Sequence, residues 1–177
     1  MAMENDVTVK VIALIPNPED FQPLIVVKDV ASNNVMFIFS DADDAYTIAT
    51  LLGGQKSEEP MSHDVTRDIL KAVSASVQKI YIKKVDKKRR LYTQIHILQE
   101  SPGKTTIIKS NQSFAIALAM VLDCPILVAG DVFRETHITL STERLVQLIA
   151  SQKSEEDNNE LTTLLKNFEP GPDKKPM

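Results

Sequence analysis

One imidazole in this sequence stands beside carboxylates where a helix is expected to begin. His63 follows Ser62 and precedes Asp64, and Asp68 lies one helical turn beyond Asp64. An imidazole next to a carboxylate can act as a general base or as a metal ligand. The same residues also suit a structural role, because serine often caps a helix and an early aspartate interacts favourably with the helix dipole. The residues alone leave both interpretations open.

Three further carboxylates crowd the expected start of an earlier helix. Asp41, Asp43 and Asp44 offer the oxygen ligands that Mg²⁺ or Mn²⁺ prefers. A divalent ion held there would suit metal-assisted hydrolysis of a phosphodiester. The alternative is a solvated first turn, since helix N-termini attract acids without any metal.

A basic cluster surrounds one predicted turn between strands, where only Asp86 opposes it. The cluster consists of Lys83, Lys84, Lys87, Lys88, Arg89 and Arg90. Such a turn could follow a phosphate backbone, and Tyr81 and Tyr92 beside it could stack on bases. Alternatively, the cations provide solubility and protect a sheet edge, while each tyrosine belongs to a strand face.

The elements that must position these residues occur twice along the chain. Apolar, β-branched runs separated by turn residues predict strands, and these lie at residues 7–15, 23–30, 35–39, 77–85, 91–98 and 105–109. Each group of three strands precedes a helix, the first ending at Gly53 and the second near Leu122, and another helix is expected at about 62–75. A shift of seventy residues aligns both helix starts, for example Ser40 with Ser110.

The predicted fold class is therefore α+β, with duplicated β-β-β-α units around an antiparallel or mixed sheet. The units span about residues 7–52 and 77–122 of a single domain covering residues 1–152. The alternative is a chance likeness of two α+β segments. A short strand at 125–128 and helices near 130–136 and 142–150 follow.

The last segment, residues 153–177, differs in composition from the rest. It is acidic and contains Pro170, Pro172 and Pro176, which predicts a disordered end. Before that end, an apolar stripe predicts one short amphipathic helix. The stripe consists of Leu161, Leu164, Leu165 and Phe168. It is expected to dock on its own domain or on another subunit.

Composition limits the class of protein. The 177 residues carry a formal net charge of −4, which argues against a surface that binds nucleic acid or anionic membrane everywhere. The single cysteine, Cys124, excludes an internal disulfide and a cysteine-based zinc cluster. The longest charge-free apolar stretch, residues 110–122, is too short to cross a bilayer. A cytoplasmic protein without a membrane partner is expected.

Several motifs resemble those of the bifunctional nuclease domain family, small bacterial and plant proteins assigned DNase and RNase activity. The similar segments are Pro60 to Asp64, Asp44 to Ala49, Ala115 to Ala119 and Pro125 to Val128. The resemblance runs from about Val9 to Ile138. It implies a nuclease in which Asp44 and Asp64 hold Mg²⁺ or Mn²⁺, His63 assists proton transfer, and the basic cluster holds DNA or RNA.

The chain departs from that family's pattern at one element. Where the family has Arg-Pro-Ser-Asp, this sequence has Asn111-Gln112-Ser113-Phe114, and Glu59 stands where arginine is usual. An arginine can clamp phosphate with two donors, which asparagine and glutamine cannot match. The second hypothesis is therefore a catalytically inactive binding or assembly module, a homo-oligomer on the same fold.

Overall fold

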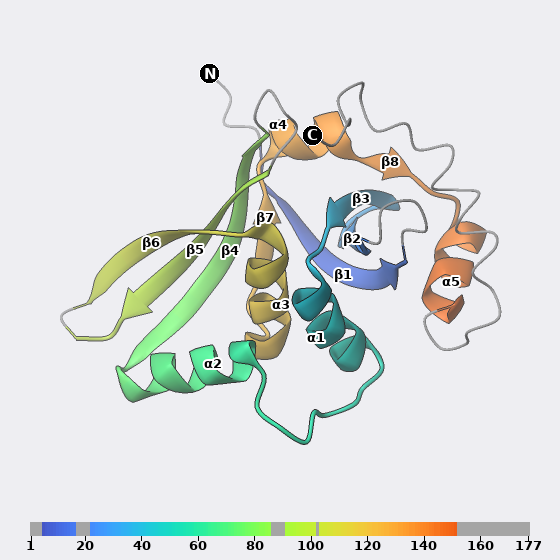
Figure 1. Cartoon of the computed structure of the whole chain (residues 1–177). Coiled ribbons are helices and arrows are strands. Elements are labelled where there is room, and N and C mark those ends of the chain that lie inside the picture. Colours follow the sequence, from blue (N-terminus) through green and yellow to red (C-terminus); the bar gives the residue numbers. More distant parts are fainter. Residues whose placement is uncertain (1–4, 17–21, 86–90, 102, 152–177) are drawn as a thin grey trace, which may run out of the picture.

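The computed structural model describes residues 5–16, 22–85, 91–101 and 103–151, and its strands form one mixed sheet (Figure 1). In chain order the elements are β1 (Val7–Ile15), β2 (Leu24–Asp29), β3 (Asn34–Phe39), α1 (Ala42–Leu52), α2 (Ser62–Ala72), β4 (Ala75–Val85), β5 (Leu91–Gln99), β6 (Lys104–Ser110), α3 (Gln112–Leu122), β7 (Ile126–Val128), α4 (Gly130–Thr136), β8 (Ile138–Thr139) and α5 (Thr142–Ser151). The α+β prediction is confirmed. The predicted tail, residues 153–177, lies outside the described residues.

The strand order places one short strand at the centre of two meanders. The order across the sheet is β6-β5-β4-β7-β1-β2-β3-β8. Strand β7 is parallel to β4 and antiparallel to β1. The first strands of the two units therefore run in opposite directions on either side of β7, as expected for duplicated units related by an approximate two-fold axis.

The strand registers and the helix starts repeat with the predicted spacing. In the first unit Ile25 pairs with Ile38, and in the second Ile95 pairs with Ile108. The Ser40 hydroxyl donates to the backbone carbonyl of Asp41 at 3.0 Å, and the Ser110 hydroxyl donates to the backbone carbonyl of Asn111 at 3.0 Å. The predicted duplication is confirmed in strand order, in register and in these bonds.

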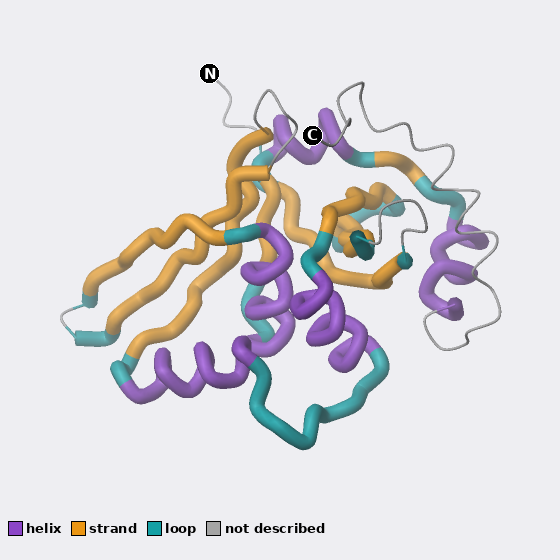
Figure 2. The backbone as a smooth tube through the Cα atoms, viewed as in Figure 1, coloured by secondary structure: helices purple, strands orange, loops and turns teal. Residues whose placement is uncertain are grey.

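The main core lies between one sheet face and helices α1 and α3, which are side by side in Figure 2. Small residues let α3 approach both α1 and the sheet, since Ala115, Ala117 and Ala119 are all essentially inaccessible to solvent. Buried isoleucines from both units, among them Ile48 and Ile80, fill the space between the helices and the strands.

The opposite sheet face is closed differently in the two units. Under the first unit, Leu145 and Leu148 of α5 pack against Val26 and Val35, forming a second apolar cluster. In the second unit the residue equivalent to Val26 is His96, which is partly exposed. The duplicated backbone thus carries an apolar face in one unit and a polar face in the other.

One short strand goes beyond the predicted elements. The short strand β8 pairs with β3 through Asn34 and Val35 and so lengthens the first meander. Within the described residues, no helix combines the length and apolar character needed to cross a membrane.

Candidate functional site

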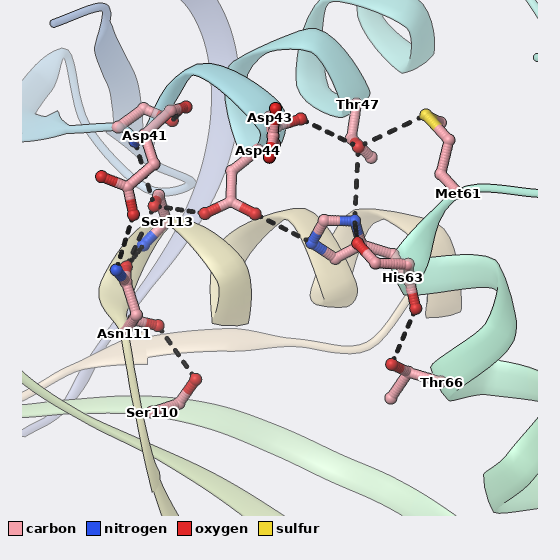
Figure 3. Close-up of polar contacts among 12 residues, drawn as sticks. Asp41, Asp43, Asp44, Thr47, Met61, His63, Thr66, Ser110, Asn111 and Ser113 are labelled. Carbon is pink, nitrogen blue, oxygen red and sulfur yellow. Dashed lines mark hydrogen bonds and ion pairs between the residues drawn. The ribbon is translucent and has the colours of Figure 1, made fainter.

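Three helix starts converge where the two units meet. Asp44 lies in the first turn of α1, His63 in the first turn of α2, and Ser113 in the first turn of α3. Figure 3 shows the Asp44 carboxylate between the other two side chains. Each of the three residues is buried. Segments distant in sequence therefore bring an imidazole, a carboxylate and a hydroxyl together beneath the surface.

The Asp44 carboxylate uses one oxygen for each partner. The Ser113 hydroxyl donates to Oδ2 at 2.5 Å, a length typical of a hydrogen bond to an ionised acceptor. The His63 Nε2 atom lies 3.2 Å from Oδ1. Because the carboxylate stands between serine and histidine, the order differs from a nucleophilic triad, in which the histidine lies in the middle.

His63 is held on all sides by the protein. Its side chain is 1% exposed, and the Phe114 ring stacks on the imidazole with 4.6 Å between centroids. The hydroxyls of Thr47 and Ser62 lie 3.3 and 3.4 Å from Nδ1. With Asp44 ionised, the proton belongs on Nε2, and Nδ1 is the acceptor. The Nε2 atom approaches Asp44 without ideal hydrogen-bond alignment, so it is incompletely satisfied.

The protonation of His63 is set mainly by its burial. Burial lowers the pKa of His63, while the nearby carboxylates of Asp44 and, more weakly, Asp64 oppose that shift. The lowered pKa favours the neutral imidazole near neutral pH. A neutral imidazole beside an ionised carboxylate is the form that can accept a proton.

The lowered pKa of His63 predicts a loss of stability in acid. Below the ordinary histidine pKa of about 6.5, the unfolded chain binds a proton that the folded protein resists, so the free energy of unfolding falls with falling pH. Urea unfolding at pH 7.5 and 5.5 should show this loss, and His63→Gln should reduce it. Burial also lowers the pKa of His96, so His96→Gln measures that residue's share separately.

Asp64 is occupied by structural partners. Its Oδ2 atom accepts the Met61 backbone N–H at 3.1 Å, and its Oδ1 atom pairs with Arg67 at 2.9 Å. Met61, and not Ser62, is the N-cap residue of α2, so the sequence interpretation of Ser62 as the cap is wrong. Asp64 therefore caps the N-terminus of α2, and its effect on His63 is electrostatic only.

The predicted basic cluster is only partly within the described residues. Lys83 is an exposed residue of β4, and Lys84 belongs to the same strand. Lys87, Lys88, Arg89 and Arg90 lie outside the described residues. The role of the cluster in holding nucleic acid remains a prediction.

Several residues of the site escaped the sequence reasoning. The Asn111 side-chain oxygen accepts the Ser113 N–H at 2.9 Å, and its amide nitrogen donates to the Asp41 carboxylate at 2.8 Å. These bonds link the start of α3 to the start of α1. Thr47 and Phe114 enclose the imidazole. The duplication was the available signal, because a shift of seventy residues places Asp41 opposite Asn111.

A pocket of about 300 Å³ opens beside this network. Its lining comes from the starts of α1 and α3 and from adjoining strand ends, and consists of Gln22, Phe39, Ser40, Asp41, Leu91, Ser110, Asn111, Gln112 and Ser113. Ser113 is shared between the pocket and the buried pair, because its hydroxyl bonds to Asp44. The pocket therefore reaches the residue that bonds directly to Asp44.

The donor set does not suit a divalent cation in its present arrangement. The Asp44 oxygens face Ser113 and His63, and the Asp64 oxygens face Met61 and Arg67. Over the described parts of the chain, no three His, Cys, Asp or Glu side chains gather as a metal site would require. An ion between Asp44 and Asp64 would have to displace existing partners of both carboxylates.

The fold and the site define a duplicated α+β domain with a buried histidine–aspartate pair where its units meet. The chain belongs to the bifunctional nuclease domain family, whose model matches residues 25–141, more than half of the sequence. The match includes Asp44, His63 and Ser113. Among curated proteins, none matches the chain significantly.

Proposed function

We propose that this protein hydrolyses phosphodiester bonds in DNA and RNA, with the Asp44–His63 pair as its acid–base centre. The observation that carries the proposal is the 3.2 Å approach of Nε2 to Oδ1 between two residues that the sequence separates by a helix and a loop. The family to which the chain belongs supports nucleic acid as the substrate class.

In this proposal His63 accepts a proton from the attacking water. Its Nδ1 atom, which now faces the hydroxyls of Thr47 and Ser62, is the acceptor. Asp44 stabilises the imidazolium that forms, because its carboxylate stays ionised beside Nε2. Since His63 is buried and Nδ1 faces Thr47 and Ser62, one of these two side chains has to move before water reaches Nδ1.

The proposal is tested by hydrolysis of single-stranded DNA and RNA with purified protein. We expect His63→Ala to lower the rate at least about a hundredfold, as for loss of a general base. His137→Ala removes an imidazole at the C-cap of α4 that stacks on Phe133 and does not contact Asp44 or His63, so it is the matched control and should keep the rate. Equal rates for His63→Ala and the unaltered protein would refute the assignment.

Metal dependence stays a separate proposal, with Mg²⁺ or Mn²⁺ between Asp44 and Asp64 as the site to test. The same assay in EDTA and in a series of both metals decides it. Asp64→Ala is the informative variant, because a ligand role predicts a lost metal response, whereas the observed capping role predicts only a less stable α2.

A second candidate function, a non-catalytic assembly module, is favoured by a different observation. Val65 and Ile69 of α2 and its C-cap residue Val73 are each about half exposed and follow one another at four-residue spacing. Such a stripe suits contact with another subunit. Absence of hydrolysis in every metal condition, together with a multimeric mass by light scattering that falls in Ile69→Glu, would favour this function.

A further inference from the structure

Among the residues that the structure describes, no element covers one face of the second unit's meander, which is here called the open face. This open face lies opposite α3 on β4, β5 and β6, and its side chains include Lys79, Tyr81, Tyr92, Gln94, His96 and Lys109. Alternation along each strand places these residues together, and cross-strand pairing joins Lys79 to His96 and Gln94 to Lys109. All six are partly or fully exposed.

The duplication shows how unusual this composition is. In the first unit, Leu24 pairs with Phe39 and Val26 pairs with Phe37, and α5 covers the resulting apolar surface. The equivalent pairs of the second unit are Gln94 with Lys109 and His96 with Ile107. Three of these four positions in the second unit thus carry amide, imidazole and ammonium groups, and the fourth is the exposed Ile107, where the first unit carries a hydrophobic core.

Aromatic rings and ammonium groups are paired on the open face. The Lys109 Nζ atom lies 4.3 Å from the centre of the Tyr92 ring, and Lys79 Nζ lies 5.0 Å from that of Tyr81. The His96 ring meets Tyr81 edge to face at 6.0 Å. Exposed cation–π contacts are weak, on the order of 0.5–1 kcal/mol. A ligand that offers phosphate to the lysine and a base to the ring can replace them.

We propose that this open face binds single-stranded nucleic acid, with phosphates at Lys79 and Lys109 and bases stacked on Tyr81 and Tyr92. Stacking on aromatic side chains beside cations is how many proteins bind single strands without sequence preference. This inference rests on the proposed function for its substrate class, but it assigns the binding to a surface separate from the Asp44–His63 pair.

Charge identifies the occupant as a polyanion. Burial, together with the positive charges of Lys79 and Lys83, lowers the pKa of His96. The two ammonium groups therefore both lie close enough to His96 to make this part of the open face positive. A second copy docked through the same face would place lysines against lysines, which is unfavourable. Two carboxylates, Asp6 and Asp131, limit the positively charged surface at the Tyr81 side. Asp6 accepts the Tyr81 hydroxyl at 3.0 Å, and burial together with both carboxylates raises the pKa of Tyr81.

The open face also leads to the pocket. Leu91 and Ser110 line the pocket, and their chain neighbours Tyr92 and Lys109 belong to the open face. Thr93 and Ser110 are paired across β5 and β6, which places these neighbours at the same end of the sheet. A nucleic-acid strand bound at Tyr92 and Lys109 would pass around the end of β5 and β6, at Leu91 and Ser110, to reach Ser113 in the pocket.

The experiment is a fluorescence anisotropy titration of the full chain with a labelled phosphorothioate oligothymidylate of about twelve nucleotides. The phosphorothioate keeps the charge and resists cleavage. We expect Tyr92→Leu with Lys109→Gln to raise Kd at least about tenfold in low salt. The matched control is Tyr46→Leu with Lys104→Gln, which removes the same groups from α1 and from the other face of β6. It should change Kd less than about twofold.

The outcomes separate this inference from the proposed function. Equal Kd values for the two double variants, or no binding by the unaltered protein, would overturn the open face as a binding surface whatever the hydrolysis assay shows. A selective loss of binding supports it, even if no hydrolysis is found. Light scattering of the protein without nucleic acid gives the remaining outcome. A lower multimeric mass for Tyr92→Leu with Lys109→Gln, but not for the control variant, would assign the surface to a second copy and overturn the proposal.

Discussion

Replacing Asp44 with alanine is expected to lower the free energy of unfolding by about 3 kcal/mol and to abolish hydrolysis. Asp44 is the shared acceptor for Ser113 and the nearest ionised group to His63. Its loss leaves the buried imidazole Nε2 without the carboxylate that it approaches, and an unsatisfied buried group costs about 1–3 kcal/mol. It also removes the charge-assisted bond of the Ser113 hydroxyl, which keeps Asn111 Oδ1 as an acceptor at 3.0 Å. Urea unfolding and the hydrolysis assay measure the two effects.

Asp43→Ala is the matched control for Asp44, because it removes the same charge from the same turn of α1 at an exposed position. We expect it to cost less than about 1 kcal/mol, the size of a helix-dipole interaction. Asp44→Asn then separates charge from shape, since an amide fills the space but its nitrogen cannot accept the Ser113 proton. A folded Asp44→Asn protein with full activity would contradict the assigned role.

The second large effect is expected where α5 covers the first unit. Leu148 is 2% exposed and packs in the apolar cluster that includes Val26 and Val35. Leu148→Ala would leave a cavity there, and such buried truncations cost about 2–5 kcal/mol. Thermal unfolding followed by circular dichroism should show a correspondingly lower midpoint.

Val146→Ala provides the comparison within the same helix. Val146 is 60% exposed, so its truncation should change stability by less than about 0.5 kcal/mol. If Leu148→Ala were as mild as Val146→Ala, α5 would not be holding the sheet face that it covers. Aggregation of the Leu148 variant at moderate temperature would agree with exposure of that apolar face.

The sequence predicted the sheet and its duplication because both are written in local patterns. Strands β1 to β6 are runs rich in apolar and β-branched residues, and turn residues such as Asn33 separate them. The glycines at 53 and 54 ended α1 as expected, and Gly54 adopts a φ of 66°. Strand β8 was missed, because two residues are too few to form a periodic pattern.

The site was harder to predict because its bonds connect distant segments. Periodicity placed Asp44 and His63 at helix starts, but the distance between them depends on how α1 and α2 pack, which no local pattern records. Asp64 looked like a reactive partner of His63 by adjacency, yet adjacent helical residues point in different directions. Its partners proved to be Met61 and Arg67. Ser113 stands at the serine of the family's Arg-Pro-Ser-Asp element, but no local pattern showed that its partner is Asp44.

The central position of β7 has a consequence for how the chain is made. Strands β1 and β4 both pair with β7, which follows them in sequence. During translation both meanders leave the ribosome before β7. The edges of β1 and β4 that pair with β7 therefore stay unpaired until Val128 has emerged. A nascent chain stalled after α3 would therefore hold two half-sheets, each with an unpaired edge strand. Unpaired edge strands are the sites through which partly folded chains aggregate and to which chaperones bind.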